Sequence, residues 1–170
     1  GMICMQQEGL LSLQVIFNAL RQRAITELFP KALETGTGII VRLPLASGLL
    51  SGKFKPNSIF SESDHRNYNK NGDAFNVGET FAGLAFEKGL QFIEHLKEVY
   101  PEGEMSLAQF ALRWILDHKA VSTVIPGASK VEQVRSNAHA SDLNPLSEDL
   151  HIELSDFYNN EVEQFIRGVY

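Results

Sequence analysis

The spacing of apolar residues along the chain predicts alternating strands and helices. Residues 11–17 (Leu-Ser-Leu-Gln-Val-Ile-Phe) first alternate apolar and polar and then become continuously apolar, which is typical of a largely buried strand. Residues 25–34 carry apolar side chains at helical spacing, and residues 38–43 form a second apolar run. This strand–helix–strand pattern predicts two parallel neighbouring strands. Because proline costs about 3 kcal/mol in a helix interior, we expect the helix to restart or kink at Pro30.

The next part of the chain is less regular. Residues 54–80 have no clear periodicity and are rich in Asn, Gly and Ser, so they predict a long loop, which in a compact domain is usually functional or disordered. Helical spacing returns at residues 81–99 and 106–117, and an acidic amphipathic helix is expected after Ser147.

Residues 121–138 predict a strand that passes directly into a helix. The β-branched run 121–125 ends at Pro126, and the helix begins near Lys130, with Ser129 as its expected N-cap. Gly127 admits backbone conformations closed to other residues, which also predicts that the strand stops there. Such a turn points free backbone N–H groups at one place, which favours an anion, usually phosphate. Ordinary strand–turn–helix junctions look the same, so this pattern alone leaves both interpretations open.

Composition narrows the class of protein. With 44% apolar and 21% charged residues, the 170 residues are expected to form one globular domain, 1–170. Fifteen basic residues against 21 acidic ones give a net charge of −6, which disfavours a nucleic-acid partner. The single cysteine, Cys4, fits a reducing compartment. The sequence shows no membrane span and no secretory signal, so we expect a cytoplasmic protein without a membrane partner. Gly1 before Met2 resembles an expression scar.

Four stretches, in this order, resemble the aldo-keto reductases over roughly residues 11–140. They are Leu13-Gln-Val-Ile-Phe-Asn18, Val41-Arg-Leu-Pro-Leu-Ala-Ser-Gly-Leu-Leu-Ser-Gly-Lys53, Ser106-Leu-Ala-Gln-Phe-Ala-Leu-Arg-Trp114, and Ile125-Pro-Gly-Ala-Ser-Lys130 with the Glu-Gln-Val and Asn137 that follow. In the family's barrel they are similar, respectively, to the sixth strand, the seventh strand with its pyrophosphate loop, the helix before the last strand, and the last strand with its helix. The resemblance implies an α/β fold that is part of a (β/α)8 TIM barrel, with about three parallel strands and flanking helices.

The resemblance also implies an NADP(H) site, because these segments hold that cofactor in the family. Gln14 would contact the nicotinamide carboxamide. The pyrophosphate loop would be Pro44, Leu45, Ala46, Ser47, Gly48 and Leu49, with Lys53 nearby. The 2′-phosphate and adenine would meet Gly127, Ala128, Ser129, Lys130, Gln133 and Asn137.

Some positions depart from the family pattern. Arg42 stands where an aromatic ring usually stacks on nicotinamide; its guanidinium either stacks there or pairs with a carboxylate. Gln133 stands where members that prefer NADP often carry arginine, and Ser136 where many carry a glutamate that faces adenine. Lys130 either supplies the missing positive charge or is an ordinary surface lysine. The choice between NADPH and NADH therefore stays open.

The family's catalytic Asp, Tyr, Lys and His come from the first half of its barrel, so no catalytic residue is assigned in this chain. None of the five histidines matches the catalytic one. His65, on the long loop, is a weak candidate for a site role, and the other four are expected at surfaces or helix ends. No metal-ligand spacing is present, so no metal site is predicted.

The sequence therefore predicts the NADP(H)-binding part of an aldo-keto reductase-like oxidoreductase, inactive alone. It would meet a small-molecule carbonyl substrate only when the missing half completes it. Three strands cannot close a barrel, so we expect two exposed strand edges, an apolar uncovered face, and self-association or a partner that supplies the missing strands. The alternatives are a non-catalytic half-barrel interaction module and a truncated fragment.

Overall fold

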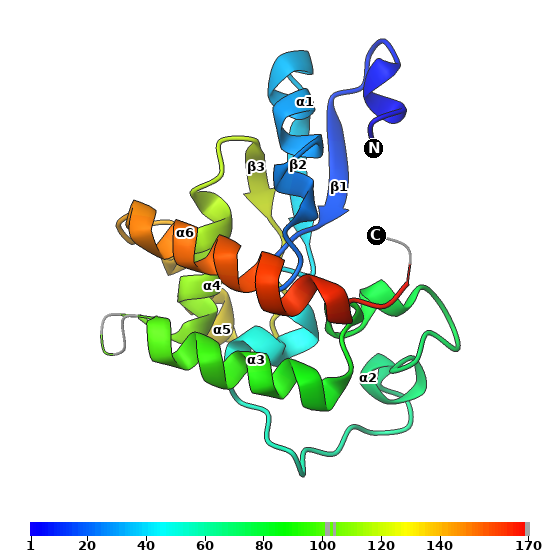
Figure 1. Cartoon of the computed structure of the whole chain (residues 1–170), viewed down its shortest axis with the longest axis vertical. Helices are drawn as coiled ribbons and strands as arrows, with labels where there is room; N and C mark the ends of the chain where they lie inside the picture. Colours follow the sequence, from blue (N-terminus) through cyan, green and yellow to red (C-terminus); the bar gives the residue numbers. More distant parts are fainter. Residues whose placement is uncertain (101–102, 104, 169–170) are drawn as a thin grey trace.

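The computed structural model describes residues 1–100, 103 and 105–168, and contains a parallel sheet of three strands (Figure 1). The strands are β1 (Ser12–Ile16), β2 (Gly38–Arg42) and β3 (Val121–Val124), in the order β1-β2-β3. Gln14 lies opposite Ile40, and the pairing of β2 with β3 is irregular between Ile39 and Ile40. The predicted parallel pairing of the first two strands is confirmed.

A 3-10 turn at Arg23–Ile25 and helix α1 (Leu28–Thr35) connect β1 to β2. Pro30 neither kinks nor restarts this helix, so that prediction is wrong. It is the third residue of α1, in the first turn, where backbone N–H groups have no partner within the helix and a missing one costs little. The helix ends at Gly36, which caps it in the left-handed conformation with φ of 69°.

The remaining helices form the lower part of the molecule in Figure 1. They are α3 (Phe86–Val99), α4 (Leu107–Leu116), α5 (Val131–His139) and α6 (Glu148–Phe157), which continues as a π turn (Tyr158–Val162) and a 3-10 turn (Glu163–Phe165). The helix predicted over 81–99 starts later, because Phe81 and Ala82 have positive φ in the 3-10 turn Phe81–Gly83. A capping box between Ser106 and Gln109 fixes the start of α4.

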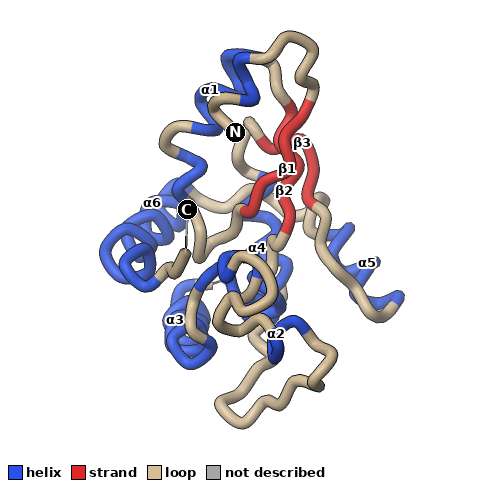
Figure 2. The backbone as a smooth tube through the Cα atoms, turned by 90° about the vertical axis from the view of Figure 1, so that its right-hand side faces the viewer, coloured by secondary structure: helices blue, strands red, loops and turns tan. Residues whose placement is uncertain are grey.

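The core lies between one face of the sheet and the helices. Ile39 and Val41 of β2 are fully buried, and Phe17 stacks on Trp114 of α4 with ring centroids 4.9 Å apart. Figure 2 shows α1 and α6 on one side of the strands, whereas α5, on the other side, lies beyond the strand ends. The opposite face of the sheet thus lacks a covering helix in the part of the chain that the structure describes.

This uncovered face is not the apolar surface that the sequence predicts. It includes Gln14 and Ile16 of β1, Ile40 and Arg42 of β2, and Thr123 of β3. Gln14 and Thr123 pair with Ile40 from either side, and Ile16 pairs with Arg42. Gln14 and Thr123 are exposed and Ile40 is half-buried. Polar and charged side chains beside two isoleucines make this face mixed rather than apolar.

The long connection 54–80 contains α2 (His65–Tyr68) and a 3-10 turn (Val77–Glu79). Buried Asn69 holds it together: its Oδ1 accepts the N–H groups of Ala74 and Phe75 at 3.0 and 2.9 Å, and its Nδ2 donates to Thr80 Oγ1 at 3.0 Å.

Two further 3-10 segments are Cys4–Gln6 and Ala46–Ser51. Within the described residues, no helix is long and apolar enough to cross a bilayer.

Candidate functional site

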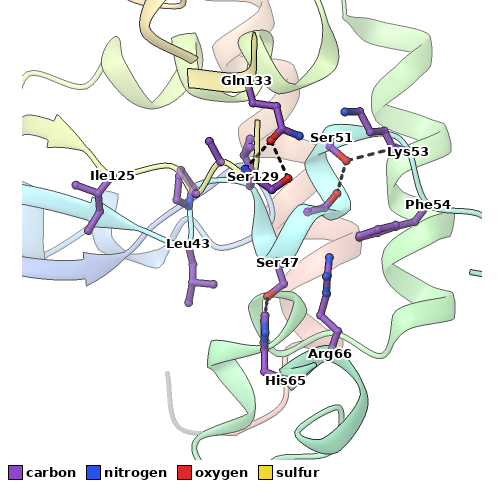
Figure 3. A pocket seen from close by; sticks show the side chains of 15 residues that line it. Leu43, Ser47, Ser51, Lys53, Phe54, His65, Arg66, Ile125, Ser129 and Gln133 are labelled. Carbon is purple, nitrogen blue, oxygen red and sulfur yellow. Dashed lines mark hydrogen bonds between the residues drawn. The ribbon is translucent and has the colours of Figure 1, made fainter. Parts of the chain in front are cut away.

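An open pocket of about 500 Å³ lies at the carboxyl ends of β2 and β3 (Figure 3). Three segments line it: the turn after β2, the turn between β3 and α5, and the long connection. Nine residues predicted from the sequence meet there, namely Pro44, Leu45, Ser47, Gly48, Lys53, Gly127, Ala128, Ser129 and Gln133. Two predicted loops that are about 80 residues apart in the sequence therefore do form one concave surface.

The turn after β2 has an unusual backbone. Leu43, Ala46 and Ser47 have φ of 53°, 48° and 56°, and Gly48 has φ of 96°. A side chain at Gly48 would place its Cβ 3.0 Å from the ring of Phe54, closer than ordinary contact. Non-glycine residues in this region are strained, and such strain tends to cluster at ligand sites. The turn therefore holds a strained backbone beside the pocket.

The Ser47 hydroxyl connects this turn to the long connection. Its Oγ donates to the carbonyl of Glu79 at 3.3 Å and accepts the N–H of Phe81 at 3.1 Å. The Nε2 of His65 lies 3.3 Å from the same oxygen (Figure 3). These contacts place the long connection against the pocket.

The start of α5 differs from its prediction. The N-cap is Lys130, not Ser129, and the side-chain Oε1 of Gln133 accepts the backbone N–H groups of Ser129 and Lys130 at 2.7 and 3.1 Å. Gln133 therefore satisfies two donors just before α5, which are not the first-turn N–H groups that an N-cap Ser129 would have satisfied. Gly127 does not use its special conformational freedom, because its φ is not positive. The space around its Cα is open to 4 Å.

The lining of the pocket carries positive charge. It includes the cations Lys53 and Arg66, of which Arg66 pairs with Asp64, and the imidazole of His65; no carboxylate is among the described residues that line it. Arg66 also lies over the Phe60 ring at 4.7 Å, and its Nε donates to Asp64 at 2.9 Å. The hydrogen bonds from Arg66 hold the pKa of the Asp64 carboxyl below its usual range, although partial burial opposes them. In a chain with a net charge of −6, this pocket favours an anion.

Six predicted residues lie outside the lining. Ala46 and Leu49 are buried and pack in the core, and Gln14 is exposed on β1. Lys130 and Asn137 are on α5 but do not line the pocket. Arg42 pairs with Glu79 through both carboxylate oxygens, with Nη2 2.6 Å from Oε1, so the carboxylate alternative describes it.

The pocket also contains residues that the sequence analysis did not assign to the site, namely Leu43, Ser51, Phe54, His65, Arg66 and Ile125. From the sequence, His65 was only a weak candidate for a site role. The one local signal was Asp64, whose side chain accepts the N–H of Arg66 and begins α2, so that His65 and Arg66 project from an ordered helix. Among the described residues, no three His, Cys, Asp or Glu side chains gather to hold a metal ion.

The model of the aldo/keto reductase family matches residues 4–159. The chain belongs to this family. Members of the aldo/keto reductase family are oxidoreductases that generally use NAD(P)H. A probable voltage-gated potassium channel subunit beta from Arabidopsis thaliana is 30% identical over 150 residues, 87% of this chain and 41% of the relative. An L-glyceraldehyde 3-phosphate reductase from Escherichia coli K12 is 37% identical over 106 residues, 62% of this chain and 29% of the relative.

Solved structures with the same fold include an aldo-keto reductase from Bacillus halodurans in its holo form and a glycerol dehydrogenase from Gluconobacter oxydans. The first has a TM-score of 0.65 at 24% identity and covers 99% of this chain and 47% of the other. The second has a TM-score of 0.71 at 23% identity and covers 94% of this chain and 45% of the other. This aldo/keto reductase chain therefore spans less than half the length of the relatives and structures it matches.

Proposed function

We propose that the pocket binds the phosphate-bearing part of NADP(H), and that the chain is the C-terminal, cofactor-binding part of an aldo/keto reductase barrel. The whole enzyme would reduce an aldehyde or ketone, with hydride supplied by the bound cofactor. The proton donor would come from the half of the barrel that this chain does not supply. A cytoplasmic location fits its exposed single cysteine, Cys4.

The observation that carries the proposal is the charge of the pocket. The cations Lys53 and Arg66 line a space of about 500 Å³ without a carboxylate among the described lining residues. A pyrophosphate is a compact double anion and matches such a surface, since charge-assisted hydrogen bonds are stronger than neutral ones. The family membership makes a dinucleotide the natural bearer of that group.

Each part of the lining has a role in this proposal. The strained turn at Ser47 and Gly48 presents main chain to the pyrophosphate, and Lys53 supplies a mobile positive charge. Arg66, oriented by Asp64, supplies a planar set of donors from the long connection. Phe54 and Ile125 give the pocket its apolar walls. The long connection thus acts as one side of the cofactor site.

The proposal also explains what Gln133 does there. Its amide oxygen occupies the N–H groups of Ser129 and Lys130, where a 2′-phosphate would bind. A phosphate must displace this neutral oxygen, so the 2′-phosphate contributes less affinity than at an uncapped helix start. We therefore propose that the chain accepts NADPH and NADH with similar affinity.

The experiment is an equilibrium titration of the purified chain with NADPH and with NADH, followed by cofactor fluorescence. The expected result is saturable binding of both cofactors, with dissociation constants within a few-fold of each other. No saturable binding up to millimolar cofactor would remove the cofactor role from this chain.

A second candidate function is a non-catalytic half-barrel module, which the uncovered sheet face favours. Gln14, Ile40 and Thr123 form a surface without a helix over it in the described residues, and β1 and β3 are edge strands. Some relatives are named as channel subunits, so association with another protein occurs among them. For such a module, a second copy or another chain would supply the missing strands. The same would hold if the chain is a truncated fragment. Size-exclusion chromatography with light scattering tests self-association: a dimer supports it, and a monomer at high concentration contradicts it.

A further inference from the structure

Glu79 bonds to both ends of the strained turn that follows β2, residues 43–48. Its carboxylate accepts N–H groups from both Nη atoms of Arg42, the last residue of β2, with Nη2 2.6 Å from Oε1. Its backbone carbonyl accepts the hydroxyl of Ser47 at 3.3 Å, near the other end of the turn. One residue of the long connection, 37 positions after Arg42, therefore spans the turn.

The turn depends on contacts from outside, because positive φ at its non-glycine residues costs free energy and persists only where the surrounding structure enforces it. Its own hydrogen bonds span only three residues, from the N–H of Ala46 to the carbonyl of Leu43 at 3.0 Å and from Gly48 to Leu45 at 2.8 Å. On one side, Nδ2 of Asn18 donates to the carbonyl of Leu43 at 2.9 Å. On the other side, the contacts come from residues 79–81 of the chain.

The Arg42–Glu79 pair lies behind the turn rather than in the pocket at the ends of β2 and β3. Neither side chain lines that pocket, whereas most of the turn between them does, namely Leu43, Pro44, Leu45, Ser47 and Gly48. The two side chains are 31% and 29% exposed, so water screens the pair only in part. Two parallel bonds between a guanidinium and a carboxylate fix orientation as well as distance. The pair therefore acts on a ligand in this pocket only through the turn.

We propose that Glu79 is a positioning residue of the phosphate site: through Arg42 and Ser47 it holds residues 43–48 in the conformation that receives the pyrophosphate of NADP(H). Because the ligand and the ion pair favour the same arrangement of the turn, breaking the pair lowers the affinity for the ligand. By the same linkage, a bound ligand stabilises the pair. That the ligand is NADP(H) rests on the proposed function; that the pair holds the turn does not.

The first test is an NADPH titration of Glu79→Gln, which keeps the size of the side chain and the backbone carbonyl but removes the charge. We expect the affinity to fall about fivefold. Loss of a negative charge by itself would strengthen the binding of an anion, so a weaker binding distinguishes positioning from long-range electrostatics. Glu94→Gln is the matched control, since Glu94 pairs with Lys97 on the surface of α3, and it should not weaken binding. Equal or higher affinity in Glu79→Gln overturns the proposal.

Exchange of the two charges separates positioning from direct contact. Arg42→Glu and Glu79→Arg each place two like charges together, and each should weaken NADPH binding. The double variant restores an ion pair with its charges reversed, and we expect its affinity to return to within about twofold of the parent. If Arg42 touched the cofactor itself, the double variant would stay as weak as Arg42→Glu alone, and that result would overturn the positioning role.

Amide hydrogen exchange of the chain without ligand tests the turn directly. In Glu79→Gln the N–H groups of Ala46, Gly48 and Phe81 should exchange faster than in the parent, whereas that of Phe110 in α4 should not change. Unchanged exchange in the turn, or an equal increase at Phe110, overturns the proposal. Faster exchange in the turn without NADPH binding by the parent would end the proposed cofactor role and leave the effect of the pair on the turn standing. NADPH binding with unchanged exchange would do the reverse.

Discussion

The side-chain Oε1 of Gln133 accepts the backbone N–H of Ser129 at 2.7 Å, four residues before it in the chain. The same oxygen accepts the N–H of Lys130 and lies 3.1 Å from the Ser129 hydroxyl, which donates to it. One neutral side chain thus satisfies two backbone donors immediately before α5. This local cap orders the turn and, under the proposed function, competes with a phosphate for these two donors.

Replacing Gln133 by alanine should lower the free energy of unfolding by about 1 kcal/mol, the usual value of a helix cap. Urea denaturation measures it. The matched control is Gln91→Ala on α3, where the side chain is exposed and accepts a bond from Lys88 only, so the change should stay within about 0.5 kcal/mol. Equal effects of the two substitutions would show that Gln133 is no cap.

Ser47→Ala should destabilise the chain by about 1–3 kcal/mol, because it leaves the N–H of buried Phe81 without its acceptor. Ser51→Ala is the control in the same segment. Its hydroxyl donates to the nearby carbonyl of Gly48 at 2.7 Å and accepts the exposed N–H of Lys53 at 3.4 Å, which water can replace, so the loss should cost about 1 kcal/mol or less. Chemical denaturation compares them. A smaller loss in Ser47→Ala than in Ser51→Ala would contradict the bridging role of Ser47.

Gly48→Ala and Gly127→Ala should behave differently. Alanine at position 48 meets Phe54 and adopts φ of 96°, so the unfolding free energy should fall by about 1–3 kcal/mol. At position 127 a Cβ meets no atom within 4 Å, so stability should change by less than about 0.5 kcal/mol. If a phosphate approaches that turn, Gly127→Ala nevertheless weakens NADPH binding in the titration. Unchanged NADPH affinity would place the phosphate elsewhere.

His118 should make stability depend on pH. Burial against Phe17 and Trp114 lowers the pKa of His118 below its usual 6.5, although the Trp114 carbonyl, 2.9 Å from Nδ1, opposes this. The folded state therefore binds the proton less readily than the unfolded state. Stability is complete above about pH 6.5 and falls as the pH drops through the lowered pKa. His118→Phe should lose less stability than the parent between pH 7 and pH 5, as urea denaturation measures; equal losses would contradict this.

Much of the fold was predictable because it follows from local pattern. The apolar runs of β1 and β2 and the helix between them predicted their parallel pairing, and the helical spacing over residues 106–117 predicted α4. The prediction at Pro30 failed because the helix begins at Leu28, which places Pro30 in its first turn. The exact first residue of a helix is poorly determined by sequence propensity. The late start of α3 depends on positive φ at Phe81 and Ala82, which no local sequence pattern signals.

The site was predictable only in part. The turns at residues 44–48 and 127–129 were expected to bind one ligand and do line one pocket. The contributions of His65 and Arg66 depend on how the long connection folds around buried Asn69, and that is decided by contacts between residues far from any periodic segment. Likewise, the partner of Arg42 is Glu79, 37 residues away, so its ion pair required the structure.

The most direct test of the central claim is the affinity of the chain for NADPH when one lysine of the pocket is removed. Lys53 lines the pocket and Lys55, two residues on, does not, although both are exposed. We predict that the parent chain binds NADPH, that Lys53→Met weakens binding by about tenfold, the value of one charge-assisted hydrogen bond, and that Lys55→Met leaves it unchanged. Equal affinities in both variants, or no binding by the parent, would contradict the account.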